Sequence, residues 1–168
     1  MAVNPKEITQ RNFVSIKING KSYFGDPSET ILQISKRNGI EIPHLCYKEG
    51  MRPDGNCRAC MVEIEGERVL QPSCVRTISD GMIINTDSSR VKSSQKIVLE
   101  LLSSDVSDKV YKKKSELTDW AEKLEIKKNR FPTNVQEKHD LTHPAIAVNL
   151  DACIQCTRCV RACREEQV

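Results

Sequence analysis

Residues 46–74 read CYKEGMRPDGNCRACMVEIEGERVLQPSC and contain four cysteines, separated by ten, two and thirteen residues. The spacers are rich in Gly, Pro and polar residues, which predicts loop over much of the stretch. A loop that wraps a metal centre can do without a large apolar core, because the ligand bonds supply the energy that orders it. The stretch therefore predicts a centre with four thiolate ligands, Cys46, Cys57, Cys60 and Cys74.

A second cysteine group, Cys153-x2-Cys156-x2-Cys159-x3-Cys163, lies near the end of the sequence. Its spacing matches the bacterial [4Fe–4S] run, in which three cysteines bind one cluster and the fourth binds its neighbour. Residue 164 is Arg where the run usually has Pro, and no later cysteine can complete the ligand set. We therefore expect this sequence to be the N-terminal part of a longer polypeptide.

The composition favours small subdomains ordered by metal, since only 38% of the 168 residues are hydrophobic and 4% are aromatic. The formal net charge of +3 is too close to neutral to indicate a nucleic-acid partner. The N-terminal residues contain no secretory signal, and no apolar run is long enough to span a bilayer. We expect a cytoplasmic protein whose eight cysteines bind metal rather than form disulfides.

The first part of the chain predicts a hairpin followed by a short helix. Val14, Ile16 and Ile18 alternate with polar residues, and Asn19-Gly20 is a strong signal for the turn. Residues 26–39 predict a helix. In that helix Asp26 is the expected N-cap, Pro27 the first position, Glu29 the partner in a capping box and Gly39 the end.

After the third cysteine, Val62 and Ile64 alternate as in a strand, and residues 81–86 predict a last short strand. A helix is expected to begin at Asp87 or Ser88, with apolar residues along one side: Val91, Val98 and Leu102, with Ile97 and Leu101 beside them. Hairpin, packed helix and cysteine loop are the order of a β-grasp ferredoxin.

Residues 104–140 carry less information. Apolar residues at helical spacing predict a surface helix that packs on the ferredoxin domain, namely Leu117, Trp120, Ala121 and Leu124. The run Lys112–Lys114 is expected on a solvated face. The whole chain is thus predicted to be α+β, with an N-terminal arm (1–11), a [2Fe–2S] ferredoxin-type domain (12–87), a helical linker (88–140) and the start of a [4Fe–4S] ferredoxin-type domain (141–168).

A [2Fe–2S] cluster needs four thiolates from segments that curl round it, and Cys57-x2-Cys60 would supply two of them in one tight turn. Gly50 and Gly55 would let backbone amides approach the sulfides. A zinc ribbon is the main alternative, although ribbons usually have two such knuckles and only one occurs here. Disulfides or free thiols are the remaining alternatives.

The segments RPDGNCRACMVEIEG and AVNLDACIQCTRCVRACREEQV resemble the N-terminal module shared by three proteins. These are the large iron–sulfur subunit of respiratory complex I, the diaphorase subunit of NAD-linked hydrogenases and the alpha subunit of molybdenum formate dehydrogenase. The likeness is greatest to formate dehydrogenase. It implies that the first four cysteines bind a [2Fe–2S] cluster, that Cys153, Cys156 and Cys159 bind part of a [4Fe–4S] cluster, and that Cys163 serves a neighbouring cluster.

The chain departs from the family at one cluster. Many members hold another [4Fe–4S] cluster with one His and three Cys, but no cysteine lies between Cys74 and Cys153. His139 and His143 are therefore interpreted as loop residues. A molybdopterin domain would follow downstream in the parent protein, and neither a dinucleotide fingerprint nor a P-loop is present in this chain.

The sequence therefore predicts an electron relay with no catalytic residues of its own. The parent protein would be an NAD-dependent formate dehydrogenase, with electrons passing from the molybdopterin site through the clusters to a flavin/NAD-binding subunit, beside other iron–sulfur subunits. A complex I subunit or hydrogenase diaphorase is the first alternative. A zinc-binding interaction module is an alternative of another class.

Overall fold

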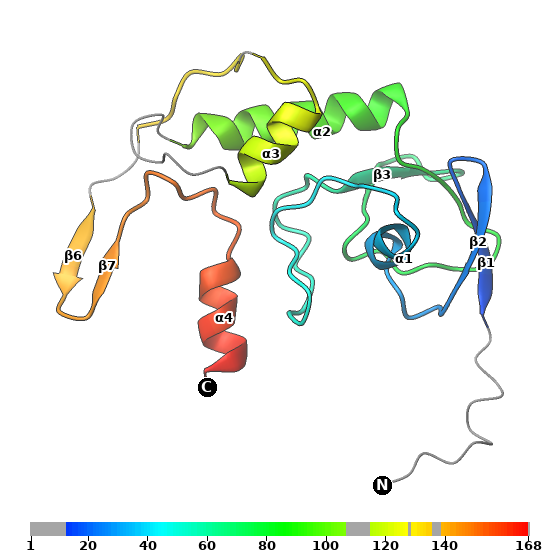
Figure 1. Ribbon diagram of the computed structural model, residues 1–168, viewed down its shortest axis with the longest axis horizontal. Coiled ribbons are helices and arrows are strands. Elements are labelled where there is room, and N and C mark those ends of the chain that lie inside the picture. Colours follow the sequence, from blue (N-terminus) through cyan, green and yellow to red (C-terminus); the bar gives the residue numbers. More distant parts are fainter. Residues whose placement is uncertain (1–12, 107–114, 128, 136–138, 168) are drawn as a thin grey trace, which may run out of the picture. The chain divides into compact units, whose positions relative to one another are not determined.

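A computed structural model describes residues 13–106, 115–127, 129–135 and 139–167 (Figure 1). The predicted N-terminal arm and Lys112–Lys114 lie outside these residues. The chain forms two compact units. One contains the described residues up to Ile42 together with Cys60–Val91, and the other contains Pro43–Ala59 together with the described residues from Lys92 onward. The predicted α+β class is confirmed, and the predicted domain bounds stay a prediction.

The first unit is built on a five-stranded sheet with the order β2-β1-β5-β3-β4. Its strands are β1 (Val14–Ile18), β2 (Lys21–Gly25), β3 (Met61–Ile64), β4 (Gln71–Pro72) and β5 (Ile83–Asn85). Strand β5 lies between β1, which it pairs with in parallel, and β3, which it pairs with antiparallel. Chain segments far apart in sequence are thereby hydrogen-bonded in the centre of the sheet.

The predicted hairpin is confirmed as strands β1 and β2. Asn19 and Gly20 have φ values of 50° and 80°, the left-handed conformation that a two-residue hairpin turn of this type requires. Ile16 and Ile18 are buried, whereas Lys17 between them is exposed. The Asn19 side chain also donates to the Thr86 hydroxyl at 2.7 Å, which joins the turn to the residue after β5.

The predicted start of the first helix is wrong. Helix α1 spans Ile31–Arg37, and its N-cap is Thr30, which forms a reciprocal capping box with Gln33. Thr30 is extended because the backbone around it pairs with a distant segment. The Ile31 N–H donates to the backbone carbonyl of Arg76, and the Leu32 N–H donates to that of Ser73, each at 2.9 Å. This tertiary pairing satisfies donors of the first helical turn and prevents an earlier start.

The capping-box residues expected at the helix start form a turn before it instead. The Asp26 carboxylate accepts from Ser28 N–H at 2.9 Å, and Asp26 N–H donates to the Glu29 carboxylate at 2.9 Å. The expected end is confirmed, since Gly39 is left-handed with a φ of 72°. The bond from Asp26 N–H to Glu29 is one that the predicted capping box contains, but it stabilises a turn rather than a helix.

The helix packs on the sheet at a glycine. A Cβ atom at Gly25 would lie 2.7 Å from Cδ1 of both Ile34 and Ile78, so the absence of a side chain there lets these two residues close over β2. Val62, Ile64 and Ile84 are also buried. The expected inward positions of Val62 and Ile64 are confirmed.

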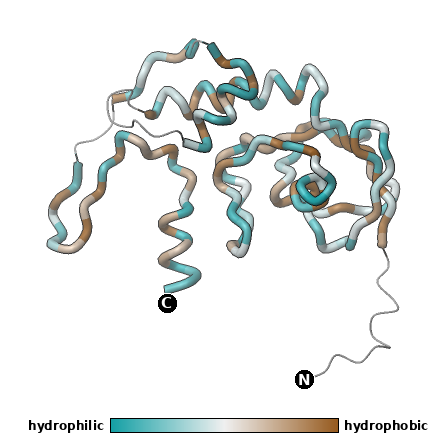
Figure 2. Tube along the Cα trace, in the orientation of Figure 1, coloured by the Kyte–Doolittle hydropathy of each residue, from teal (hydrophilic) through white to brown (hydrophobic). Residues whose placement is uncertain are grey.

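Helix α2 (Ser89–Ser104) begins as expected, since the Ser88 hydroxyl accepts from Val91 N–H at 3.2 Å. The expected face is confirmed at Val91, which is fully buried, and at Val98 and Leu102, which pack against the buried hydrophobic cluster. The prediction is wrong for the two residues expected beside them. Ile97 and Leu101 are 40% and 45% exposed, whereas Leu99 is fully buried. Hydrophobic and hydrophilic residues are interspersed along this helix (Figure 2), so its apolar content alone did not decide which side is covered.

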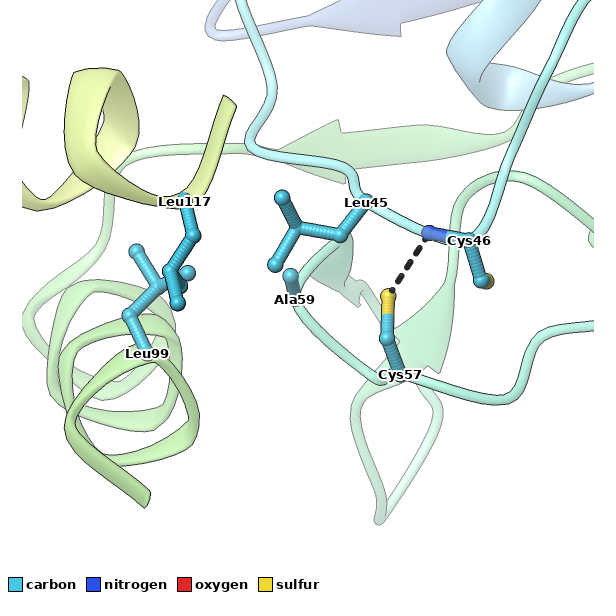
Figure 3. Close-up of a cluster of buried hydrophobic side chains, with 6 residues drawn as sticks. All are labelled: Leu45, Cys46, Cys57, Ala59, Leu99 and Leu117. Carbon is cyan, nitrogen blue, oxygen red and sulfur yellow. Dashed lines mark hydrogen bonds between the residues drawn. The ribbon is translucent and has the colours of Figure 1, made fainter. Parts of the chain in front are cut away.

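The second unit contains α3 (Glu116–Lys123), the hairpin of β6 (Asp140–His143) and β7 (Ile146–Val148), and α4 (Arg158–Glu166). Leu117 of α3 packs with Leu45, Ala59 and Leu99 in a buried cluster, which confirms the predicted packing of this helix (Figure 3). His139 is outside regular structure, as predicted, but His143 ends strand β6, so its assignment to a loop is wrong. Among the described residues, no helix combines the length and apolarity needed to cross a membrane.

Candidate metal centre

Cys46 and Cys57 lie side by side in the second unit. The Cys46 N–H points at the Cys57 sulfur, at an N–Sγ distance of 3.4 Å, and both residues are buried (Figure 3). The hydrogen bond with the Cys46 side chain, and then burial, raises the pKa of the Cys57 thiol above its ordinary value. In the metal-free chain this thiol therefore stays protonated at neutral pH. A bound cation would have to displace the proton.

Left-handed residues bend the loop that carries this pair. Gly50 and Gly55 have φ values of 87° and 64°, which glycine adopts without steric cost. Arg58, inside the Cys57-x2-Cys60 spacer, is also left-handed at 59°. The backbone of an L-residue seldom takes this conformation, so the turn after Cys57 is a specific feature of the loop.

Cys60 and Cys74 lie in the first unit. Met61, beside Cys60, is paired with Pro72 in strands β3 and β4, and Ser73 N–H donates to the Cys60 carbonyl at 3.0 Å. Cys60 is 1% exposed and Cys74 fully buried. The short strand β4 thus positions Cys74 beside the strand that follows Cys60.

The second cysteine group precedes and enters α4. Cys153 and Cys156 are half-buried, and Cys159 and Cys163 are exposed. Cys156 also packs against the buried cluster that contains Cys46 and Cys57. Each of the two short spacers holds one left-handed residue, Gln155 (φ 54°) or Thr157 (φ 61°), so the backbone turns twice before α4 begins at Arg158.

Two arginines between these cysteines were not singled out from the sequence. Arg161 is 3% exposed and donates to the carbonyl oxygens of Cys46 and Arg52. Arg158 donates to the carbonyl oxygen of Tyr47 at 2.8 Å. The only sequence feature that could have indicated their role is their position within CTRCVRAC. From the sequence alone, an arginine there is more simply predicted to be solvated.

Further hydrogen bonds join the same two segments. Asn56 donates from its side chain to the Gln155 carbonyl at 2.7 Å, and the Thr157 hydroxyl donates to the Asp54 carboxylate at 3.1 Å. The first cysteine loop and the second cysteine group are thus tied together within the second unit, through polar contacts as well as the buried cluster.

The donor set suits an iron–sulfur cluster. All eight cysteines are free thiols, and the first four are buried. Within the described part of the chain, no group of three or more His, Cys, Asp or Glu side chains has the arrangement of a single-ion site. A [2Fe–2S] cluster takes its four thiolates as two per iron. Cys46 and Cys57, adjacent within one unit, suit one such pair.

Comparison with known proteins identifies the N-terminal half. Residues 11–89 match the family model described as "2Fe-2S iron-sulfur cluster binding domain". The matched range contains all four cysteines of the first group, which confirms a [2Fe–2S]-type domain at the level of the family.

The [2Fe–2S] domain and the residues after it are also similar to curated proteins. The chain is 34% identical over 161 residues to an NADH-quinone oxidoreductase subunit of Rhizobium meliloti (strain 1021), covering 90% of this chain and 19% of the relative. It is 35% identical over 167 residues to "NADP-reducing hydrogenase subunit HndD" of Solidesulfovibrio fructosivorans, covering 93% of this chain and 28% of the relative. The chain thus spans less than a third of the length of each.

A solved structure shows the same fold. In the "Crystal structure of NAD+-reducing [NiFe]-hydrogenase in the H2-reduced state", one chain matches with a TM-score of 0.81 and 27% identity, over 91% of this chain and 67% of that one. The relatives and the solved structure that match this chain are thus NADH-quinone oxidoreductase and hydrogenase subunits. This coarser part of the predicted family is confirmed.

Proposed function

We propose that the chain is the iron–sulfur electron-transfer segment of an NADH-quinone oxidoreductase or NAD-reducing hydrogenase-type subunit. The main support for this proposal is the family match over residues 11–89. Every cysteine within these residues is a free, buried thiol. The named relatives support this alternative over the formate dehydrogenase expected from the sequence. Formate oxidation and a downstream molybdopterin domain remain sequence-based predictions.

The proposed [2Fe–2S] ligands are Cys46, Cys57, Cys60 and Cys74. A bound cluster of this kind takes up and releases one electron at a time. The chain's own contribution is to exclude water from the four sulfurs and to aim backbone donors at them, as Cys46 N–H does at the Cys57 sulfur. Hydrogen bonds to sulfur and burial are two of the factors that set the potential of such a cluster.

For the second group we propose that Cys153, Cys156 and Cys159 are ligands of a [4Fe–4S] cluster and that Cys163 serves a neighbouring one. Three observations support this. They are the cysteine spacing, the left-handed turns at Gln155 and Thr157, and the packing of Cys156 on the buried hydrophobic cluster that contains Cys46. Electrons would then pass between two adjacent centres in this chain. The proposed partners are a flavin/NAD-binding subunit and further iron–sulfur subunits, in the cytoplasm.

The first test is the metal content of the 168-residue chain, produced and purified without oxygen. We expect iron and acid-labile sulfide, visible absorbance, and an EPR signal of a [2Fe–2S] cluster after reduction. A colourless chain that contains stoichiometric zinc would support the interaction module instead. A chain without iron, sulfide or zinc would contradict both.

The second test assigns the ligands with a matched pair of substitutions. Cys74→Ser should abolish the [2Fe–2S] EPR signal, whereas Ser73→Ala should keep it, because the neighbouring Ser73 is equally buried but its hydroxyl has no partner among the described residues. Cys153→Ser should keep the [2Fe–2S] signal and remove iron and sulfide of the second centre. Retention of the signal in Cys74→Ser would remove Cys74 from the ligand set.

A further inference from the structure

Arg161 is a buried cation, and its three hydrogen-bond acceptors among the described residues are all neutral. Its Nη2 donates to the carbonyl oxygen of Cys46, its Nη1 to that of Arg52 at 2.5 Å, and its Nε to the Thr157 hydroxyl at 3.3 Å. Only 3% of the residue is exposed. A buried charge is costly unless an opposite charge or several hydrogen bonds offset it. Hydrogen bonds are present here, but no carboxylate is among these acceptors.

Arg158, one helical turn earlier, differs in this respect. It donates to the Tyr47 carbonyl at 2.8 Å, and its Nη1 also pairs with the Glu116 carboxylate at 2.5 Å. Its positive charge is thus offset by a glutamate. The two arginines make similar contacts to consecutive residues of the first cysteine loop, and within the described part of the chain only Arg158 is paired with an acid.

An iron–sulfur cluster bound by Cys46 and Cys57 would supply negative charge near Arg161. A cluster with four thiolates is anionic in both oxidation states and gains a further negative charge on reduction. A cation held by the carbonyl of a ligand cysteine stabilises the reduced form more than the oxidised form, because the attraction grows with the charge of the cluster. Burial limits the screening of this attraction by salt.

The hydrogen bonds of Arg161 also fix the loop itself. The Cys46 carbonyl is held by the guanidinium, while the Cys46 N–H is directed at the Cys57 sulfur. The peptide units on both sides of Cys46 Cα are therefore oriented by partners outside the local backbone. Since residues 46–52 contain no helix or strand, such contacts replace the hydrogen bonds that regular structure would provide.

We propose that Arg161 is a positioning residue that locks the Cys46 loop to helix α4 and raises the reduction potential of the cluster held by that loop. The effect on potential rests on the proposed function, and the locking of the loop does not. The two parts can therefore be tested separately, the locking role in the metal-free chain and the effect on potential in the loaded one.

The first experiment measures hydrogen exchange of the metal-free chain in peptides that cover residues 46–52. Arg161→Gln should increase the exchange rate of these amides about tenfold relative to the parent chain, and Arg164→Gln should leave it unchanged. Arg164 is the control because it is an exposed arginine of the same helix. Unchanged exchange in Arg161→Gln would overturn the locking role, whether or not the chain binds iron.

The second experiment is an EPR-monitored redox titration of the anaerobically loaded chain. Arg161→Gln should lower the equilibrium constant for reduction about tenfold, which is about 59 mV for a one-electron couple. Arg161→Lys keeps the charge and should recover most of this loss. Arg158→Gln should shift the potential less, since it removes a charge that Glu116 already offsets.

The outcomes separate the two proposals. A potential that is the same in Arg161→Gln and Arg164→Gln would overturn the electrostatic role of Arg161. An equal fall in Arg161→Lys and Arg161→Gln would do the same, because the charge alone would then have no effect. If the parent chain takes up no iron, the proposed function fails, while the exchange experiment still decides whether Arg161 locks the loop.

Discussion

Arg158 donates a 2.8 Å hydrogen bond to the carbonyl oxygen of Tyr47, across 111 residues of sequence. The contact joins helix α4, which carries Cys159 and Cys163, to the residue directly after Cys46. Together with Arg161 it makes the loop of the first cysteine pair dependent on a distant helix of the same unit. The order of this loop is therefore a tertiary property.

Arg158→Gln should destabilise the metal-free chain by about 1–3 kcal/mol, the usual result of leaving a buried backbone acceptor without its donor. The lost contact to Glu116 adds little, because that side chain is 58% exposed. Chemical denaturation measures the free energy of unfolding, with Arg164→Gln as the control. Equal stability of the two variants would show that the Tyr47 carbonyl finds another donor or water.

Leu99→Ala should destabilise the chain by about 2–5 kcal/mol, because it opens a cavity in the cluster of Leu45, Ala59 and Leu117. Leu101→Ala is the matched control on the same helix and should change the free energy of unfolding by no more than about 0.5 kcal/mol, since a surface residue has little packing to lose. Thermal and urea unfolding of both variants test this. A larger loss in Leu101→Ala would contradict the assigned buried face of α2.

Gly25→Ala and Gly20→Ala test two different requirements for glycine, close packing at position 25 and a positive φ at position 20. An added Cβ at Gly25 would lie 2.7 Å from Ile34 Cδ1, so we expect a loss of about 1–3 kcal/mol from overpacking. Gly20 has open space around it but a φ of 80°, so we expect a loss of about 1–2 kcal/mol from the backbone alone.

A second substitution distinguishes these causes. Ile34→Val removes one of the two Cδ1 atoms that Gly25→Ala would crowd, so it should recover part of the stability in the Gly25→Ala background and none in the Gly20→Ala background. A double-mutant cycle on unfolding free energies measures the coupling. The absence of coupling between positions 25 and 34 would mean that the sheet moves to accommodate the new methyl group.

The stability of the metal-free chain should depend on pH through Cys57. The thiol pKa is raised in the folded state, chiefly by the Cys46 side chain and then by burial, so folding favours the protonated form. This contribution is complete below the ordinary thiol pKa of 9.0 and is lost progressively as the pH rises above it. Unfolding free energies between neutral and alkaline pH measure it, and Cys57→Ser should show a weaker dependence.

Loading with metal should show the opposite pH dependence. Binding requires thiolates, so protons are released and the apparent affinity should rise with pH. The proton release can be measured by titrating the metal-free chain with zinc or ferrous iron in two buffers of different ionisation enthalpy. No proton release near neutral pH would contradict a protonated Cys57 thiol.

The sequence determined by itself the features whose causes are local. The turn at Asn19-Gly20 follows from the tolerance of these residues for positive φ, and the alternation of Val62 and Ile64 follows from the two-residue period of a strand. The spacing of the cysteines also indicated iron–sulfur chemistry, since few other centres use four thiolates in such a pattern.

Only the tertiary structure decided the features that depend on distant segments. Helix α1 begins after Thr30 rather than at Asp26 because residues 73–76 supply the acceptors for its first amides. Leu99 is buried and Leu101 exposed because of where Leu45 and Leu117 lie, and Arg161 holds the Cys46 carbonyl across 115 residues. Local propensities of residues in one segment contain no information about partners so far away in the chain, and folding is what brings them together.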